Sequence, residues 1–288
     1  MTFMSMCMGA AIGTGVVVSQ YFGAKDEKGT AASIANGGYT CILIALIMTV
    51  IALVTTKPVL LLLNTPESLM PDALTYMYIF MGGLIAVAAY FTPFSILRAL
   101  GDSKTPLIFL VFCSLLNIVL DLLFIRTFGM GVRGAAIATV IAQGISVVLC
   151  LIYIVTKAKI LLPEKRHFAL DRGLYADLLA QGFSMGFMSS IIYVGSIVLQ
   201  PGINSLGYET IAGHTAARKL FSFSMMPLSS MAQAVNTYVA QNRGADNWER
   251  VRKGIRYAYL FCFSVTIALI ICVTPFAPTL VHLCLLYT

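Results

Sequence analysis

Long stretches without a charged residue dominate this sequence and limit the folds open to it. The uncharged runs cover 1–24, 29–56, 73–97, 134–156, 178–208, 220–242 and 257–281. Most of them meet the length of about 20 residues that a helix needs to cross a bilayer. Inside a bilayer, backbone N–H and C=O groups find partners only within a helix or a closed barrel. We therefore predict an all-α integral membrane protein, folded as a polytopic helix bundle.

The composition supports the membrane assignment. The 288 residues are 59% hydrophobic and 11% charged, whereas a soluble domain carries about 25% charged residues. Together with the apolar segment 105–127, the runs predict eight spanning helices and the start of a ninth. The predicted spans are 1–22, 30–55, 72–97, 105–127, 132–157, 174–200, 209–242 and 250–275. Gly82 and Gly83 should bend the third span, and Ser103 or Thr105 should cap the fourth. Pro201 should end the sixth span and Pro275 the eighth.

The basic residues are concentrated in alternate loops, which predicts the orientation of the chain. Of the 19 Lys and Arg residues, 14 lie in or beside the loops near 25–28, 98–104, 158–172 and 243–250. Because short loops rich in Lys and Arg stay in the cytoplasm, we predict that these four loops are cytoplasmic. The same distribution accounts for the net charge of +7 without a nucleic-acid partner.

Asn117 and Asp121 form the most informative polar pair. They lie four residues apart on one face of an apolar helix, and Thr139 on the next helix can approach the same face. An ionisable group within a membrane span usually marks an ion path. A carboxylate, an amide oxygen and a hydroxyl are hard ligands, suited to H⁺ or Na⁺ and not to a soft metal. We predict that Asn117, Asp121 and Thr139 form an ion-coupling site.

Simpler interpretations of the same residues stay open. Asp121 lies about six residues from the predicted end of its helix, so its side chain could reach the lipid headgroups or cap a neighbouring helix. Asn117 and Thr139 could form an ordinary interhelical hydrogen bond of the kind that is common in membrane bundles.

Two groups of side chains in the second half of the chain also need an interpretation. Arg218 and Lys219 lie inside the long span 209–242; they fit either a pore lining or the outer interface, where such side chains snorkel, and we favour the interface. Flexible thioether and aromatic side chains would suit a promiscuous substrate cavity, although they more often face lipid or the core. The candidates for that cavity are Met185, Phe187, Met188, Tyr193, Met225 and Met226.

A short motif recurs at an offset of 221 residues. Gln20-Tyr-Phe-Gly-Ala24 matches Gln241-Asn-Arg-Gly-Ala245, and each copy ends a long span before a charged link. Both copies have the same predicted orientation, so the repeat is parallel, as in transporters whose two halves surround a cavity. We predict an N-terminal lobe at 1–157, a cytoplasmic linker at 158–173 and a C-terminal lobe at 174–288. The offset leads us to expect one helix before this sequence and further helices after it.

These motifs give the chain its resemblance to the multidrug and toxic compound extrusion (MATE) family. The others that contribute are Arg98-x-x-Gly-Asp102, Asn117-x-x-x-Asp121, Gly134-Ala-Ala-x-Ala-Thr139 and Ile203-Asn-Ser-Leu-Gly207. The resemblance covers nearly the whole sequence and implies two six-helix lobes, of which this chain would hold helices 2 to 9 and part of helix 10. It further implies export of cationic amphipathic compounds across the bacterial plasma membrane in exchange for H⁺ or Na⁺.

The resemblance also carries expectations about residues and partners. Asn117, Asp121 and Thr139 match the cation site of the family's first lobe, whereas the acidic residue on the family's first helix cannot be placed. No carboxylate lies between Leu178 and Tyr208, where some members carry a second acidic site. The expected partners are the lipid bilayer and small cationic, amphipathic substrates. We expect a monomer with no cofactor beyond the coupling ion.

Three other functions compete with this one. A lipid-linked saccharide flippase has a related two-lobed fold, but its cavity would be strongly basic, and only Arg218 and Lys219 qualify here. An intramembrane enzyme would need paired carboxylates, a His cluster or a Ser/His arrangement within the spans, and the sequence shows none. The third alternative is that these 288 residues alone form an inactive, truncated fragment.

Overall fold

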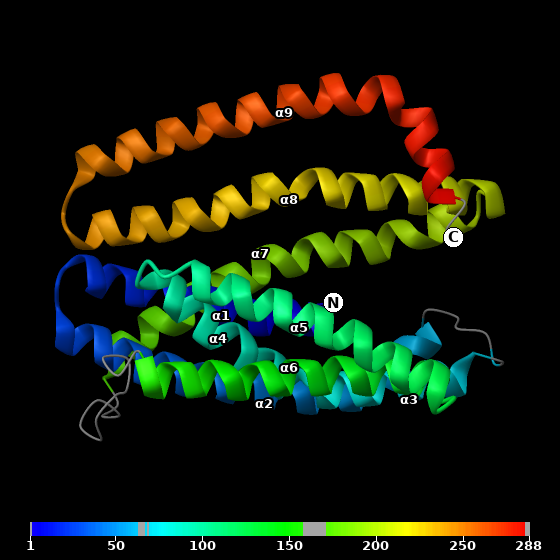
Figure 1. Ribbon diagram of the computed structural model, residues 1–288, viewed down its shortest axis with the longest axis horizontal. Coiled ribbons are helices and arrows are strands. Elements are labelled where there is room, and N and C mark those ends of the chain that lie inside the picture. The colour runs from blue at the N-terminus through cyan, green and yellow to red at the C-terminus, as the bar shows by residue number, and fades with distance from the viewer. Residues whose placement is uncertain (1, 63–66, 68, 158–170, 286–288) are drawn as a thin grey trace. The chain divides into compact units, whose positions relative to one another are not determined.

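The computed structural model describes residues 2–62, 67, 69–157 and 171–285. Every regular element in that part of the chain is a helix (Figure 1). The helices are α1 (Thr2–Gly23), α2 (Glu27–Leu62), α3 (Met70–Gly82), α4 (Leu84–Ala99), α5 (Lys104–Leu122), η1 (Leu123–Thr127), α6 (Gly131–Lys157), α7 (Arg172–Asn204), α8 (Tyr208–Gly244) and α9 (Trp248–Leu285). The predicted all-α bundle is confirmed. The chain forms two compact units, Met1–Ser190 and Ile191–Thr288.

Most of the helices have the length and the surface of membrane spans. Within the described residues, α1, α2, α5, α6, α7 and α9 are each long and apolar enough to cross a bilayer, and the bent pair α3–α4 adds one more. Large apolar side chains point outward; Val54 of α2 is 71% exposed and Ile108 of α5 is 65% exposed. Because exposing apolar surface to water costs about 25 cal/mol per Å², this surface fits lipid.

α8 departs from the prediction of eight apolar spans. Its 37 residues could cross a bilayer, but the helix does not reach the hydropathy of a span. Its first half carries Thr210, His214, Thr215, Arg218 and Lys219, and these residues lower the mean hydropathy. Charged residues in membrane proteins face a bundle interior or an aqueous cavity and avoid lipid, so the first half of α8 is where a polar cavity is expected.

The predicted third span consists of two helices. α3 and α4 meet at a bend of 42°, where the N–H of Gly83 still donates to the carbonyl oxygens of Ile79 and Phe80. A Cβ atom on Gly83 would lie 2.5 Å from Cγ2 of Val140 in α6, so the close approach of α6 favours glycine here. The bend expected from Gly82 and Gly83 is confirmed.

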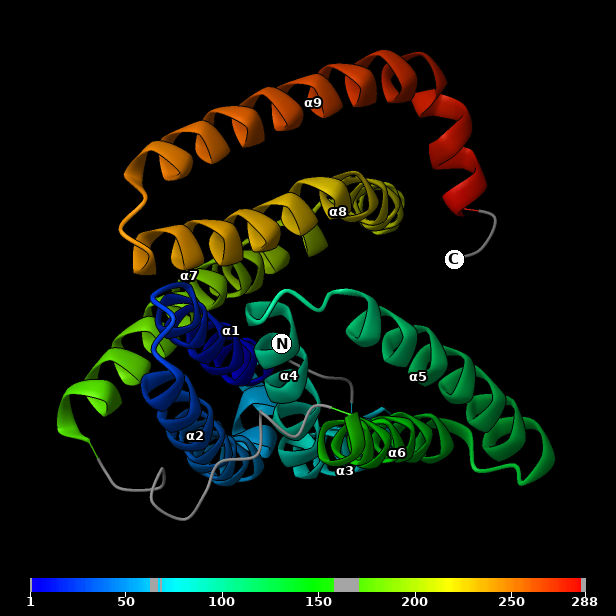
Figure 2. The same cartoon turned by 60° about the vertical axis from the view of Figure 1, so that its left-hand side comes forward.

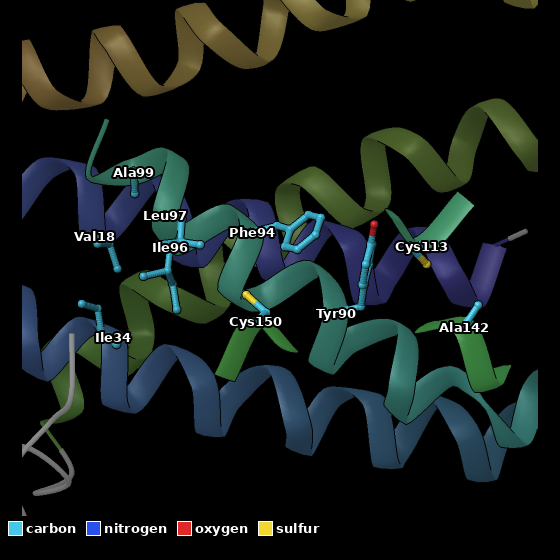
Figure 3. Close-up of a cluster of buried hydrophobic side chains, with 10 residues drawn as sticks. All are labelled: Val18, Ile34, Tyr90, Phe94, Ile96, Leu97, Ala99, Cys113, Ala142 and Cys150. Atoms are coloured by element: carbon cyan, nitrogen blue, oxygen red, sulfur yellow. The ribbon is translucent and has the colours of Figure 1, made fainter. Parts of the chain in front are cut away.

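The main core of the first unit is arranged around α4. Its buried residues are Val18, Ile34, Tyr90, Phe94, Ile96, Leu97, Ala99, Cys113, Ala142 and Cys150, from α1, α2, α4, α5 and α6 (Figure 3). The rings of Tyr90 and Phe94 on α4 pack against each other at a tilt of 45°, with their centroids 4.3 Å apart. Cys113 lies one turn before Asn117, and Ala142 lies three residues after Thr139. The core therefore holds α5 and α6 in place next to the predicted ion site.

α1 packs against the first half of α7 through small residues. The facing glycines are Gly9 and Gly13 of α1 and Gly182 and Gly186 of α7. A Cβ atom on Gly13 would lie only 2.5 Å from the backbone nitrogen of Gly182. On the same seam the buried hydroxyls of Ser5 and Ser190 share a hydrogen bond of 3.0 Å. Small residues at every fourth position allow two membrane helices to approach this closely.

This packing assigns the first half of α7 to the first compact unit, which ends at Ser190. The sequence places the division between lobes earlier, in the linker 158–173, most of which lies outside the described residues. The compact units are defined by which segments pack together. The predicted lobes are defined by which helices belong to each copy of the repeat, so the two divisions need not coincide. The lobe boundaries therefore stay a prediction.

The α1–α2 and α8–α9 connections are copies of one another at an offset of 221 residues. α1 ends at Gly23 and α8 at Gly244, and the next helix begins four residues later in both places. Lys25 and its equivalent Asp246 are the non-glycine residues with positive φ in the described chain, at 57° and 52°. This left-handed conformation ends helices and is unusual for residues with a side chain. The internal repeat predicted from the motif is confirmed.

The helices that follow the two connections also begin alike. The side chain of Asp26 accepts the N–H of Gly29 at 2.9 Å, and the side chain of Asn247 accepts the N–H of Arg250 at 3.1 Å. Both are N-cap hydrogen bonds to the third residue of the helix, at positions related by the same offset. Both copies of the repeat therefore form the same N-cap hydrogen bond, although the capping residue is Asp26 in one copy and Asn247 in the other.

α9 and α7 continue past the prolines that were predicted to end them. α9 runs to Leu285 with Pro275 inside it, and α7 runs to Asn204 with Pro201 inside it. The predicted ends of both spans are therefore wrong. A proline removes one N–H and crowds a carbonyl of the preceding turn, which can kink a helix without ending it. The C-terminal part of α9, red in Figure 1, turns away from the axis of the rest of the helix.

Asp102 caps α5 in the connection between α4 and α5. Its Oδ1 accepts the N–H groups of Lys104 at 3.1 Å and Thr105 at 3.0 Å, and its Oδ2 accepts the hydroxyl of Tyr153 at 3.4 Å. Ser103 makes no side-chain cap hydrogen bond, so the prediction of Ser103 or Thr105 as the cap is wrong. Partial burial opposes ionisation, but the hydrogen bonds outweigh it and lower the pKa of Asp102.

Replacing Asp102 with alanine should lower the free energy of unfolding by about 1 kcal/mol at pH 7, as the loss of an N-cap typically does. The pKa of Asp102 is lower in the folded than in the unfolded chain, so its contribution is present above the ordinary value of 3.8 and is lost as the pH falls through the folded-state pKa. Urea unfolding in detergent, followed by circular dichroism at pH 7 and pH 3, measures this.

Asp102→Asn is the matched control for that measurement. Asparagine keeps an oxygen acceptor for the helix N–H groups but has no charge, so it should retain most of the stability and lose the pH dependence. An alanine variant as stable as the parent at pH 7 would show that the cap does not stabilise α5.

Candidate functional site

α5 and α6 form an antiparallel pair that carries the predicted ion residues (Figure 2). Nδ2 of Asn117 on α5 donates to Oγ1 of Thr139 on α6 at 3.4 Å. The Thr139 hydroxyl in turn donates to the carbonyl oxygen of Ala135 at 3.0 Å. The structure thus brings Asn117 and Thr139 together. The hydrogen bond uses the amide nitrogen of Asn117, so the amide oxygen is still able to accept a hydrogen bond or to bind a cation.

Asp121 lies one helical turn beyond Asn117 on the same face of α5. Its Oδ1 is buried and has no hydrogen-bond partner among the described residues. A buried carboxylate oxygen without a partner is unfavourable, and a bound proton or cation would relieve the penalty. The helix changes to the π-helix η1 two residues later, at Leu123. Single π turns are frequent at functional sites.

Gln143 is a further polar residue on this seam, and the sequence did not single it out as a site residue. It lies one turn after Thr139 on α6, and its Oε1 is buried without a hydrogen-bond partner in the described chain. Because α5 and α6 are antiparallel, Gln143 and Asp121 lie on opposite sides of the Asn117–Thr139 contact. Its four-residue spacing from Thr139 is the sequence feature that places Gln143 on the same face of α6. The seam therefore carries a row of oxygen atoms of the kind that hard cations prefer.

A second polar feature, the basic cavity, lies in the second unit between α7 and α8. Its volume is about 440 Å³, and it is lined by Gln200, His214, Thr215, Arg218, Lys219, Ser222, Phe223 and Met226. Arg218 donates from Nη2 to Oγ of Ser196 on α7 at 3.2 Å. Nε2 of His214 is buried without a hydrogen-bond partner among the described residues. The sequence favoured the outer interface for Arg218 and Lys219, whereas both line this cavity in the structure. It gave no means of finding their neighbours on α7.

The predicted substrate residues fall into different environments. Met226 lines the basic cavity, and its neighbour Met225 is half-buried. Tyr193 is 37% exposed on the second half of α7. Met185 and Met188 belong to the first unit, where Met188 is 61% exposed. Phe187 is 56% exposed. The structure thus joins Met226 to a cavity, and the role of the other five in substrate binding stays a prediction.

The fold and the two polar features together define a class of protein. Long apolar helices, a parallel internal repeat and buried oxygen atoms within spans are features of polytopic membrane transporters. No cluster of three or more His, Cys, Asp or Glu side chains that could hold a metal ion occurs in the described part of the chain.

Comparison with known proteins gives the family. The family model MatE matches residues 1–123 and 185–285, and the chain belongs to this family. Two proteins of Bacillus subtilis (strain 168) are similar to it. The probable multidrug resistance protein YpnP is 34% identical over 87% of this chain and 56% of its own length. The probable multidrug resistance protein YoeA is 26% identical over 97% of this chain and 62% of its own length.

Solved structures share the fold. A MATE protein in the bent conformation has a TM-score of 0.90 at 23% identity, over 99% of this chain and 64% of its own. A MOP superfamily transporter from Pyrococcus furiosus Vc1 has a TM-score of 0.91 at 22% identity, over 98% of this chain and 63% of its own. The chain spans somewhat more than half of the length of the curated relatives it matches.

Proposed function

We propose that this protein is an antiporter that exports cationic, amphipathic compounds across the bacterial plasma membrane in exchange for H⁺ or Na⁺. The relatives are named as multidrug resistance proteins, which supports multidrug efflux. The observation that carries the antiport proposal is the buried, unpartnered Oδ1 of Asp121 beside the Asn117–Thr139 hydrogen bond. An ionisable side chain within a membrane span usually marks an ion path.

The coupling follows from competition for Asp121. A proton or Na⁺ arriving from outside neutralises the carboxylate, whereas a cationic substrate arriving from inside is stabilised by the free carboxylate. Each occupant therefore disfavours the other, and the exchange drives export when the coupling ion flows inward. Asn117, Thr139 and Gln143 would supply neutral oxygens to the ion. The two lobes alternate between inward and outward access, and each ligand shifts the populations by its differential affinity.

The remaining parts of the proposal concern location and partners. The loops near 25–28, 98–104, 158–172 and 243–250 would face the cytoplasm, as their Lys and Arg content predicts. The transporter would act as a monomer in the bilayer, with the coupling ion as its sole cofactor.

One observation favours a second function. The basic cavity places Arg218, Lys219 and His214 around one space, and cationic side chains of this kind suit an acidic lipid-linked substrate. A flippase of a related fold would use such a cavity. Multidrug export remains the primary proposal because the named relatives support it.

The test is efflux of ethidium from bacteria that lack their main drug pumps and express the longest reading frame containing this chain. Cells are loaded with the dye, and an inward gradient of either H⁺ or Na⁺ is then imposed. We expect dye fluorescence to fall under one of the two gradients and to stay constant once an ionophore dissipates it. Efflux that is equally fast with no gradient, or no efflux under either one, would contradict the proposal.

A further inference from the structure

We propose that the basic cavity of the second unit binds the acidic group, a carboxylate or phosphate, of an amphipathic molecule. This goes beyond the proposed function, which assigns cationic compounds and a cation site in the first unit. It would extend the ligands of the protein to acidic or zwitterionic amphipathic molecules. The observations that carry it are the unpaired charges, the convergence of hydrogen-bond donors and the apolar part of the lining.

In the part of the chain that the structure describes, the two cations of the basic cavity have no acidic partner. Among the described residues neither Arg218 nor Lys219 forms an ion pair, and the hydrogen bond of Arg218 goes to the neutral hydroxyl of Ser196. The nearest acidic residue in the sequence of α8 is Glu209, nine residues before Arg218, or about 14 Å along the helix axis. The segment of α7 from 178 to 204 has no Asp or Glu. An acidic ligand would supply the missing countercharge.

Several donors converge on the same space. His214, Arg218 and Ser222 follow one another at four-residue intervals, which places them on one face of α8. Across from them, Ser196 and Gln200 have the same spacing on α7. The guanidinium of Arg218 has five N–H donors, and the described hydrogen bond uses one of its nitrogens. Arginine binds carboxylates and phosphates through paired N–H groups, so its remaining donors suit an oxyanion.

His214 strengthens this assignment. Its side chain lines the cavity, and its Nε2 is buried without a partner in the described part of the chain. A buried polar atom of this kind is unfavourable unless something hydrogen bonds to it. An oxygen of an acidic ligand held by Arg218 would accept a hydrogen bond from the imidazole. The same ligand would thus bind to both Arg218 and His214.

The lining also indicates that the acidic group belongs to a larger molecule. The cavity of about 440 Å³ lies in the range of pockets that hold small organic ligands, about 300–1,000 Å³. Phe223 and Met226 line it and are 73% and 59% exposed. A flexible thioether and an aromatic ring provide adaptable apolar contacts. Two sources of such a ligand share this chemistry: an exported acidic compound and an anionic phospholipid of the surrounding membrane.

The experiment measures binding, with no ion gradient, to the purified protein in phosphatidylcholine nanodiscs. The probe is dansyl-undecanoic acid, and its primary amide is the neutral analogue. We expect the acid to bind about tenfold more tightly than the amide, as one strong ionic contact allows. Arg218→Gln combined with Lys219→Gln should abolish this preference. Equal affinities of the acid and the amide for the parent protein would overturn the proposal.

Two matched variants separate charge from folding. Arg252 and Lys253 are an adjacent Arg–Lys pair on the same unit, outside the cavity; changing both to glutamine should leave the affinity within about twofold. Exchanging the cavity pair, Arg218→Lys with Lys219→Arg, keeps both charges and should retain the preference for the acid. A loss of preference in the Arg252 and Lys253 variant as large as in the cavity variant would overturn the proposal.

Two further measurements identify the source of the acidic ligand and distinguish this proposal from the antiport proposal. Adding phosphatidylglycerol to the nanodiscs should weaken probe binding if an anionic lipid occupies the cavity. Probe binding should stay unchanged if the natural occupant is an exported acid. Both results apply once the parent protein has been shown to prefer the acid over the amide. Asp121→Asn should not alter probe binding. A protein that binds the acid but shows no gradient-driven ethidium efflux would contradict the antiport proposal alone.

Discussion

An Asp121→Asn variant is expected to lose gradient-driven dye efflux completely, to the level of cells without the transporter. Asparagine has nearly the same size, so packing against α6 changes little. The amide, however, does not release or bind a proton in the accessible pH range, and it does not neutralise a cation. Because coupling depends on the two ligands competing for one carboxylate, removing its charge removes the exchange itself. The measurement is ethidium efflux under imposed H⁺ and Na⁺ gradients.

Asp102→Asn is the control for this variant. It makes the same chemical change in the connection between α4 and α5, at a carboxylate that caps a helix. It should keep efflux within about twofold of the parent because asparagine retains an oxygen acceptor for the N–H groups of the helix. Protein amounts in the membrane are compared by immunoblot. If Asp121→Asn retains coupled efflux while both proteins are made at the parental level, the ion site lies elsewhere.

The polar neighbours of Asp121 should have graded effects in the same assay. Asn117→Ala removes one neutral oxygen and the hydrogen bond to Thr139, but leaves the charge that the coupling ion needs. Ligands of this kind set the affinity for the ion more than the ability to exchange it. We therefore expect efflux that needs a steeper gradient, and not a complete loss.

The helices could be predicted from the sequence because a span is a local property. About 20 apolar residues suffice to identify one, and the bend at Gly82 and Gly83 follows from two residues that pack poorly into a straight helix. The internal repeat was also visible, since Gln20 to Ala24 and Gln241 to Ala245 preserve the residues at a helix end. The matching positive φ of Lys25 and Asp246 confirms what that motif indicated.

The misses concern helix ends, where the type of a single residue does not decide the structure. Pro201 and Pro275 normally end a helix, yet α7 and α9 continue through them. Asp102 becomes the cap of α5 instead of Ser103 because Tyr153 on α6 also donates to its carboxylate. No residue within the segment 98–106 indicates that α6 lies beside it.

The candidate sites divide in the same way. Asn117 and Asp121 share a helix, so their spacing alone places them on one face. The pairing of Asn117 with Thr139 needed only that two consecutive helices pack together. The basic cavity instead depends on which residues of α7 face α8, and Ser196 and Gln200 carry no distinguishing signal in the sequence. Local spacing therefore predicted which candidate ion residues lie together, whereas the cavity required the three-dimensional arrangement.

Replacing Gly13 with alanine should be among the most destabilising changes in the first unit. The added Cβ would lie 2.5 Å from the backbone nitrogen of Gly182 and 2.7 Å from its Cα. These are backbone atoms of another helix, so no side chain can move aside and α1 and α7 must separate. Overpacking of this kind typically costs 1–3 kcal/mol, and occasionally more. We expect a loss of about 3 kcal/mol, a large part of the 5–15 kcal/mol that stabilises a typical domain.

Gly38→Ala provides the control, because no atom lies within 4 Å of a Cβ at that position on α2. Alanine favours a helix over glycine by about 1 kcal/mol, so this variant should be as stable as the parent or slightly more stable. Thermal unfolding in detergent and the yield of monodisperse protein measure both variants. If Gly13→Ala unfolds at the parental temperature, α1 and α7 are not in close contact along this seam. If instead it fails to accumulate while Gly38→Ala accumulates normally, the seam between α1 and α7 is a main determinant of the stability of the first unit.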